Sequence, residues 1–129
     1  MELKELVLNK KSFDAPDRTH ALEGRLTESL ELGDLELTRV TMQPGWRWSK
    51  DARDLEDTET CERLHVGYQL SGRHHVRMAD GSEIDVGPGD FYVAPPGHDD
   101  WTVGDEPSVF ISIAHKECDS PLCRDLLGQ

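Results

Sequence analysis

Apolar residues recur at every second position along several short segments of this chain, and turn residues separate the segments. The leucines of residues 30–37 alternate with polar residues on either side of Gly33-Asp34. Such alternation is typical of a half-buried strand, and a Gly-Asp pair between two such runs predicts a hairpin. Val40 and Met42 extend the second arm with a change of parity, which we interpret as a bulge.

Between residues 61 and 70 the pattern predicts a strand with two unlike faces. One face is apolar and holds Leu64, Val66, Tyr68 and Leu70. The other face is mostly polar and holds Cys61, Arg63, His65, Gly67 and Gln69. A cysteine and a histidine that both face inward from one strand indicate a role beyond packing. This second face is therefore the first candidate for a functional site.

The remaining segments also suggest strands. Asp80-Gly81 predicts a hairpin between strands at 73–79 and 82–86, and Phe91–Ala94 reads as a short buried strand. Two closing strands are expected at 101–103 and 109–113. Many short strands with turn signals about every 8 to 12 residues indicate an all-β sandwich or small barrel.

Three segments depart from this regular pattern. Two indoles, Trp46 and Trp48, fall on one face of the extended piece that follows a turn at 43–45. Residues 50–60 are highly charged and predict an irregular loop or a mobile flap. The clearest helical candidate is the tail at 121–127.

Composition narrows the class of protein. The 129 residues suit a single domain, 1–129. The formal net charge of −12 argues against nucleic acid and anionic membrane as partners, because phosphates would be repelled. The sequence has no apolar run of the roughly 20 residues that cross a bilayer, and its charged start lacks a secretory signal. We therefore expect a cytoplasmic protein.

The three cysteines, Cys61, Cys118 and Cys123, do not predict a disulfide framework, because their number is odd and no signal peptide precedes them. Cys118 and Cys123 lack a second cysteine pair or a histidine with which to form a zinc knuckle. We interpret both as reduced thiols without a role in chemistry.

The turn residues after position 88 form a recognisable frame. Gly89, Pro95 and Gly97 have the spacing Gly, five residues, Pro, one residue, Gly. This frame resembles the second conserved motif of the cupin superfamily. In that motif a histidine and an asparagine follow, and here Asp100 and Gly104 stand at those positions. His98 lies two residues before Asp100, so an extended chain points both side chains to the same side.

An earlier segment resembles the first cupin motif in its spacing. Glu59, Cys61 and His65 stand where that motif has two histidines and a glutamate, and Gly72 fits its closing glycine. Arg53 replaces the opening glycine. The resemblance covers about residues 35–115 and implies a jelly-roll cupin barrel that often forms homodimers.

The residue types support a metal site independently of the resemblance. Thiolate and imidazole together suit zinc, iron, nickel or copper better than magnesium or calcium. We therefore expect Cys61, His65 and His98 to bind a divalent transition metal. Glu59 is a candidate fourth ligand, and Asp100 is an alternative to His98. The other interpretation is that Cys61 is a small buried hydrophobe and His65 a hydrogen-bonded cavity residue.

Candidate substrate-binding residues surround this predicted centre. The aromatic residues Trp46, Trp48 and Trp101 either line an apolar pocket or belong to the core. Arg63 either binds a substrate carboxylate or forms a surface ion pair. Gln69 and Asp100 are the remaining candidates.

Three classes of function fit this sequence. The first is a metal-binding cupin that acts on a small polar organic molecule. The second is a metal-free module that binds or senses a small ligand without catalysis. The third is a domain whose partner is another protein. Fold does not choose between reactions, so the sequence names no substrate and no catalytic residue.

Overall fold

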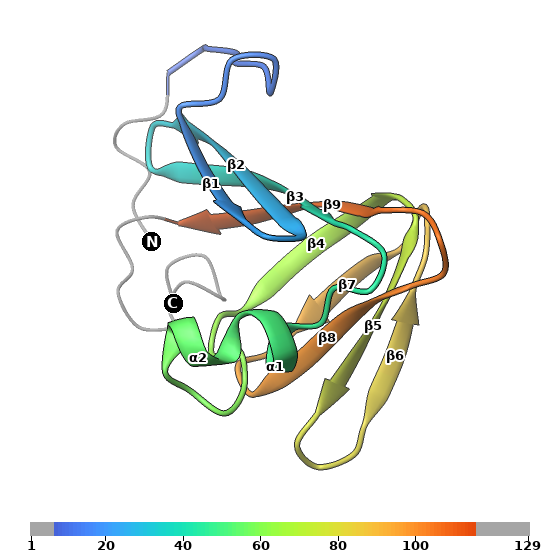
Figure 1. Ribbon diagram of the computed structural model, residues 1–129. Helices are drawn as coiled ribbons and strands as arrows, with labels where there is room; N and C mark the ends of the chain where they lie inside the picture. The colour runs from blue at the N-terminus through green and yellow to red at the C-terminus, as the bar shows by residue number, and fades with distance from the viewer. Residues whose placement is uncertain (1–6, 116–129) are drawn as a thin grey trace.

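The computed structural model describes residues 7–115, and the predicted tail helix and Cys118 and Cys123 lie outside them. Two antiparallel sheets account for most of this region, as Figure 1 shows. The larger sheet has the strand order β1-β2-β3-β9-β4-β7, and the smaller has the order β6-β5-β8. The strands are β1 (Arg18–Leu22), β2 (Arg25–Leu32), β3 (Leu35–Met42), β4 (His65–Ser71), β5 (Arg73–Met78), β6 (Glu83–Val86), β7 (Phe91–Ala94), β8 (His98–Val103) and β9 (Ser108–His115). The predicted all-β class is confirmed.

The two hairpins predicted from turn residues are confirmed. β2 and β3 pair from Leu32↔Leu35 to Arg25↔Met42, with Gly33 at a φ of +60° in the turn. The register of β2 and β3 is continuous through Val40 and Met42, so the predicted bulge is wrong. The change of parity has a simpler cause, because Leu35 and Leu37 lie on the opposite face of β3 from the buried Val40 and Met42.

The second hairpin joins β5 and β6 through Gly81, whose φ of +92° favours glycine. β8 and β9 occupy the two closing strand positions. The prediction of β7 as a buried strand is only half right. β7 lies at the edge of the larger sheet and alternates, with Tyr92 and Ala94 buried and Phe91 81% exposed.

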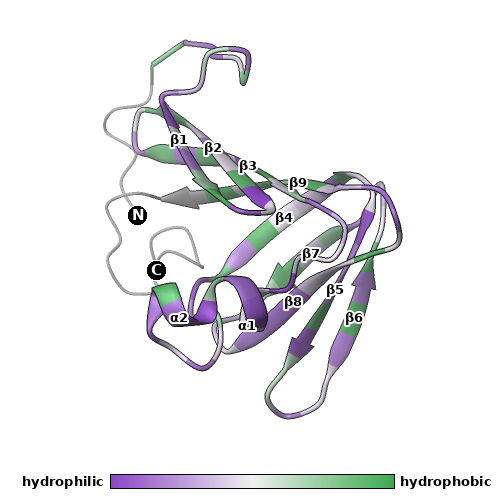
Figure 2. Ribbon diagram, in the orientation of Figure 1, coloured by the Kyte–Doolittle hydropathy of each residue, from purple (hydrophilic) through white to green (hydrophobic). Residues whose placement is uncertain are grey.

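The segment after β3 is helical where the sequence suggested an extended piece and a loop. Trp48 opens the one-turn helix α1 (Trp48–Asp51), and a second turn, α2 (Arg53–Glu56), follows it. The contacts that hold α1 come from far along the chain, since the Asp99 carboxylate accepts bonds from the Ser49 N–H at 3.0 Å and the Ser49 hydroxyl at 2.8 Å. Both helices are largely hydrophilic, as Figure 2 shows.

A single apolar core brings residues of both sheets and of the helical segment together. Trp48, Met42 and Phe110 are each at most 2% exposed. The cluster consists of Val40, Met42, Trp46, Trp48, Ala52, Cys61, Val76, Val86, Tyr92, Ala94 and Phe110. Cys61 thus belongs to this cluster, which places it beside the aromatic side chains that shape the interior. None of the helices in residues 7–115 is long and apolar enough to span a membrane.

Candidate metal centre

Cys61 reaches the interior through a short backbone bridge to the start of β8. Its N–H donates to the carbonyl of His98 at 2.7 Å, and the N–H of Gly97 donates to the carbonyl of Cys61 at 2.8 Å. The glycine and proline frame before β8 therefore does more than turn the chain. It places the backbone of His98 directly against that of Cys61, so two residues 37 positions apart in the sequence share one site.

The donor atoms of Cys61, His65 and His98 lie within 4.8 Å of one another. We call these three residues the triad. Cys61 Sγ is 3.9 Å from His65 Nε2, and the two imidazole rings meet edge to face with centroids 5.1 Å apart. Cys61 is 4% exposed and His98 is fully buried. Their burial and mutual distance leave room for one ion between three protein donors.

The orientation of the His98 ring is fixed by one hydrogen bond. Its Nδ1 is 2.7 Å from the carbonyl oxygen of Pro95, which can only accept, so Nδ1 carries the proton. Nε2 is therefore the nitrogen with a free lone pair. It is buried without a hydrogen-bond partner among the described residues. A backbone carbonyl that accepts from the other ring nitrogen and so fixes the tautomer is a usual support of a metal-binding histidine.

The electrostatics of the triad leave two of its donors uncharged. Burial raises the pKa of the Cys61 thiol to about 12. Burial, followed by the neighbouring His98, lowers the pKa of His65 well below its ordinary value. The His65 imidazole and the Cys61 thiol are therefore both uncharged near neutral pH. A divalent ion would bind the neutral imidazole of His65 and would stabilise the Cys61 thiolate that burial otherwise disfavours.

Asp100 stands at the edge of the triad and is not one of its donors. Its Oδ2 is 3.6 Å from His98 Nε2, and its Oδ1 is buried with no hydrogen-bond partner among residues 7–115. Burial raises the pKa of this carboxyl to about 6, and His98 opposes that rise. Asp100 is thus a carboxyl that exchanges a proton near neutral pH, beside the proposed ligands.

Glu59 is not brought to the triad. Its side chain is 94% exposed and lies 4.0 Å from Arg53. The prediction assumed one continuous strand from Glu59 to Leu70, in which alternate side chains share a face. β4 begins only at His65, and Asp57 adopts a left-handed φ of +57° just before Glu59, so strand parity does not extend over this turn.

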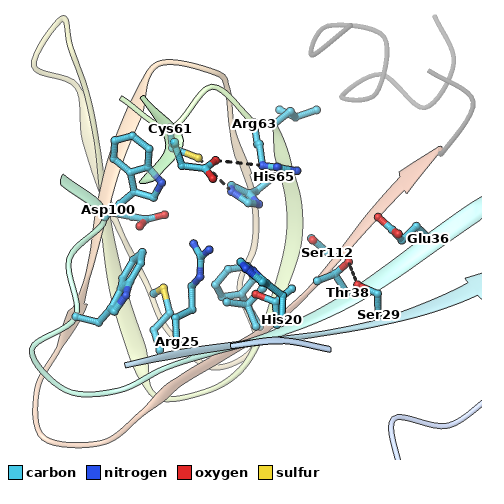
Figure 3. A pocket seen from close by; sticks show the side chains of 18 of the residues that line it. His20, Arg25, Ser29, Glu36, Thr38, Cys61, Arg63, His65, Asp100 and Ser112 are labelled. Carbon is cyan, nitrogen blue, oxygen red and sulfur yellow. Dashed lines mark hydrogen bonds and ion pairs between the residues drawn. The ribbon is translucent and has the colours of Figure 1, made fainter. Parts of the chain in front are cut away.

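A cavity of about 320 Å³ opens beside the triad. Four of the predicted substrate-binding residues line it: Trp46, Trp48, Arg63 and Asp100. Figure 3 shows its labelled polar side chains, with Cys61, His65 and Asp100 at one end and Ser29, Thr38 and Ser112 at the other. One polar residue that the sequence interpretation missed, Arg25, points into the cavity from β2.

Two predicted substrate-binding residues do not line this cavity. Gln69 is fully buried, and its amide nitrogen donates to Ser108 Oγ at 2.8 Å and to the Ser71 carbonyl at 2.9 Å. Trp101 stacks on His75 with ring centroids 4.8 Å apart, and the Arg47 guanidinium lies 4.2 Å from its ring centroid. Gln69 therefore supports the packing of the sheet, and Trp101 covers the smaller sheet.

Sequence comparison gives no relative of known activity, because no protein-family model and no curated protein matches. Solved structures do match. A protein of unknown function from Rhizobium leguminosarum bv. viciae 3841 has a TM-score of 0.61 at 20% identity, over 84% of this chain and 96% of that one.

Two further matches carry descriptions of function. A sugar phosphate isomerase of the cupin superfamily from Silicibacter pomeroyi has a TM-score of 0.51 at 19% identity, over 71% of this chain and 59% of that one. Oxalate decarboxylase from Lactobacillus farciminis has a TM-score of 0.55 at 18% identity, over 80% of this chain and 32% of that one. At these identities the likeness shows the fold alone.

Proposed function

We propose that this chain, which has the cupin fold, binds a divalent transition metal through the triad and acts on a small polar organic molecule in the adjoining cavity. One observation carries the proposal. His98 Nε2 is buried without a hydrogen-bond partner in the described part of the chain and faces two further soft or borderline donors, Cys61 Sγ and the His65 imidazole. An orphaned buried acceptor is costly, and a metal ion satisfies all three groups at once.

The donor set narrows the choice of metal. One sulfur and two imidazole nitrogens suit zinc, iron, nickel or copper, whereas magnesium and calcium prefer oxygen ligands. Three protein ligands leave coordination positions for a substrate, which is the usual arrangement of a catalytic site. When bound, such a metal supplies Lewis-acid or oxygen-binding chemistry at these open positions.

The chain's own residues have distinct tasks in this scheme. The buried indoles of Trp46 and Trp48 form an apolar part of the cavity wall. Asp100 Oδ1 has no hydrogen-bond partner within residues 7–115, and the pKa of its carboxyl is about 6, so it can accept or return a ligand proton near neutral pH. The backbone carbonyl of Pro95 keeps His98 in its metal-binding tautomer.

The test is elemental analysis of untagged protein purified without a chelator. The parent is expected to hold close to one iron, zinc, nickel or copper ion per chain. Cys61→Ala and His65→Ala are expected to lose it. His75→Gln is the matched control, since His75 lies on the smaller sheet between Glu83 and Asp85 and outside the cavity.

Two results would contradict the proposal. One is a folded parent that holds no metal and takes up none on titration with these four ions. The other is metal that stays in the Cys61→Ala and His65→Ala proteins but leaves His75→Gln, which would place the ion on the surface. Circular dichroism of each variant separates loss of metal from loss of fold.

A metal-free binding module is the second candidate, and one observation favours it. Burial raises the pKa of the Cys61 thiol to about 12, so the thiol alone is a neutral and unreactive part of the cavity wall. A module of this kind would bind its ligand equally well before and after chelator treatment. The metal-dependent protein would lose turnover under the same treatment.

A further inference from the structure

Three arginines line the cavity, and their surroundings differ. Arg18 forms ion pairs with Glu36 and, at 3.5 Å, with Glu31. Arg63 lies 3.8 Å from Glu56. Arg25 has no acidic partner within 4.0 Å among the described residues, and its buried Nε lacks a hydrogen-bond partner. Of the three, Arg25 is the one whose charge is not met by a contacting carboxylate in residues 7–115.

The position of Arg25 follows from strand pairing. It opens β2, opposite Met42 of β3, on the face that also carries Thr27 and Ser29 toward the cavity. Its guanidinium lies 5.1 Å from the ring centroid of Trp46, which supports it from one side. Figure 3 shows the side chain extending into the cavity on the same side as Asp100. The side chain is thus held in place with its donors free.

An unmatched cation at a partly buried position is unfavourable. Burial lowers the pKa of Arg25, but a guanidinium stays charged at any physiological pH. Removing a charge from water costs free energy that only a contacting counter-charge or good hydrogen bonds recover. The negative group that acts most strongly on Arg25 is Asp100, yet no hydrogen bond or ion pair joins the two. A separate anion would satisfy the five donors of the guanidinium.

Arg25 also shares its cavity with two residues of the triad. Cys61 and His65 line the same cavity as Arg25. A ligand held by Arg25 would therefore reach the triad within the same 320 Å³ cavity. The far end of the cavity offers hydroxyls from Ser29, Thr38 and Ser112, which suit a ligand that carries hydroxyl groups of its own.

We propose that Arg25 is the anchor for the carboxylate of a small hydroxylated organic acid, whose remaining atoms reach the triad. This inference rests on the proposed function, because it names the substrate class of the same cavity. A carboxylate matches the planar fork of a guanidinium through two parallel hydrogen bonds. One unmatched positive charge favours a monoanion, and Glu36, Glu56 and Asp100 in the wall disfavour ligands of higher negative charge.

The experiment titrates chelator-treated protein with lactate and glycerate as probes. Lactamide serves as the uncharged control and inorganic phosphate as the alternative anion. Binding is followed by amide chemical shifts in NMR spectra and by thermal melting. The variants are Arg25→Gln and, as the matched control, Arg18→Gln, which removes an arginine of the same cavity that already has acidic partners.

We expect at least one of the two acids to bind saturably and to raise the melting temperature of the parent. Arg25→Gln should weaken that binding by roughly 10- to 100-fold, the usual effect of losing a charge-assisted pair of hydrogen bonds. Arg18→Gln should change it far less, and lactamide should not bind. Without ligand, Arg25→Gln should melt at or above the temperature of the parent, because it removes an unmatched charge.

Several results would overturn the inference. One is binding of neither acid, and another is equal affinity in the parent and in Arg25→Gln. Binding of phosphate but of no carboxylate would refute the carboxylate assignment. The metal proposal is tested separately by the metal content of the same samples before chelation. Carboxylate binding at Arg25 in a protein that never holds metal would refute the proposed function and leave this inference standing.

Discussion

The most quantitative prediction concerns the pH dependence of metal affinity. Cys61 must lose its proton to bind a metal as thiolate, and burial raises the pKa of that thiol to about 12. At any working pH the thiol is therefore protonated, and each metal ion bound releases one proton. Metal affinity should rise tenfold per pH unit, which is about 1.4 kcal/mol of binding free energy per unit.

The pKa of His65 sets the lower end of the pH range over which this tenfold rise in affinity per pH unit should hold. Burial and the neighbouring His98 lower the pKa of His65 well below 6.5, so His65 should contribute no further proton over about pH 6.5 to 9.5. If the ligand were an ordinary exposed thiol, with a pKa near 8.5, the metal affinity would instead stop rising toward the upper end of that range. A straight line of slope one through pH 9 is therefore the signature of the buried thiol. At pH 7 the deprotonation alone costs about 7 kcal/mol, which the metal–thiolate bond must offset.

The assay is competition against a chromophoric chelator at a series of pH values, with zinc as the probe. Calorimetry in two buffers of unlike ionisation enthalpy gives the number of protons released directly. Cys61→His is the comparison variant, because a third imidazole keeps a donor at this position without a thiol proton. Its affinity should be nearly independent of pH. A parent that releases no proton on binding zinc would refute the assignment of Cys61 as a ligand.

Three other predictions follow from the described residues. Gly72→Ala should destabilise the fold by at least about 3 kcal/mol in urea unfolding, because φ is +67° and a Cβ would lie 2.0 Å from the Pro107 carbonyl oxygen. The control Gly81→Ala, with a φ of +92° and no atom within 4 Å of its Cβ, should cost only about 1–2 kcal/mol, and equal losses would refute the steric argument. Burial lowers the pKa of His74 to about 4, so its contribution to stability is full above pH 6.5 and falls by about 3 kcal/mol toward pH 4. His74→Gln should flatten the pH profile of unfolding over that window, and an unchanged profile would refute the assignment. The homodimer implied by the cupin resemblance stays a prediction, and light scattering should give twice the chain mass of 14.5 kDa and not the mass itself.

The local parts of the fold were predictable from sequence. Both hairpins follow from short-range turn chemistry, because a Gly-Asp or Asp-Gly pair between alternating runs has few other conformations. The structure brings together Cys61, His65 and His98, which the sequence analysis had grouped by residue type and by motif spacing. Cys61 reaches this group through an isolated bridge to His98 and not through β4, which begins at His65.

The non-local parts were not predictable. Glu59 was included in the predicted metal site on the assumption of strand parity across a turn that breaks it. The helix α1 depends on Asp99, some 50 positions away, and no local pattern reveals that contact. Arg25 enters the cavity only because β2 pairs with β3. In the sequence alone it is simply a polar residue at the start of an alternating run. Its charge is unmatched because no carboxylate among the described residues contacts it, and only the three-dimensional structure shows that.

The proposed function requires that one sulfur and two imidazole nitrogens of this chain bind a single metal ion. X-ray absorption spectroscopy of the metal-loaded parent identifies these ligand atoms. We expect one sulfur at about 2.3 Å and two nitrogens at roughly 2.0–2.1 Å for zinc, with lighter atoms at the open positions. Loss of the sulfur shell in Cys61→Ala should follow. A first shell of oxygen and nitrogen alone in the parent would contradict the assignment of Cys61 as a ligand, and a shell without imidazole nitrogen would contradict that of His65 and His98.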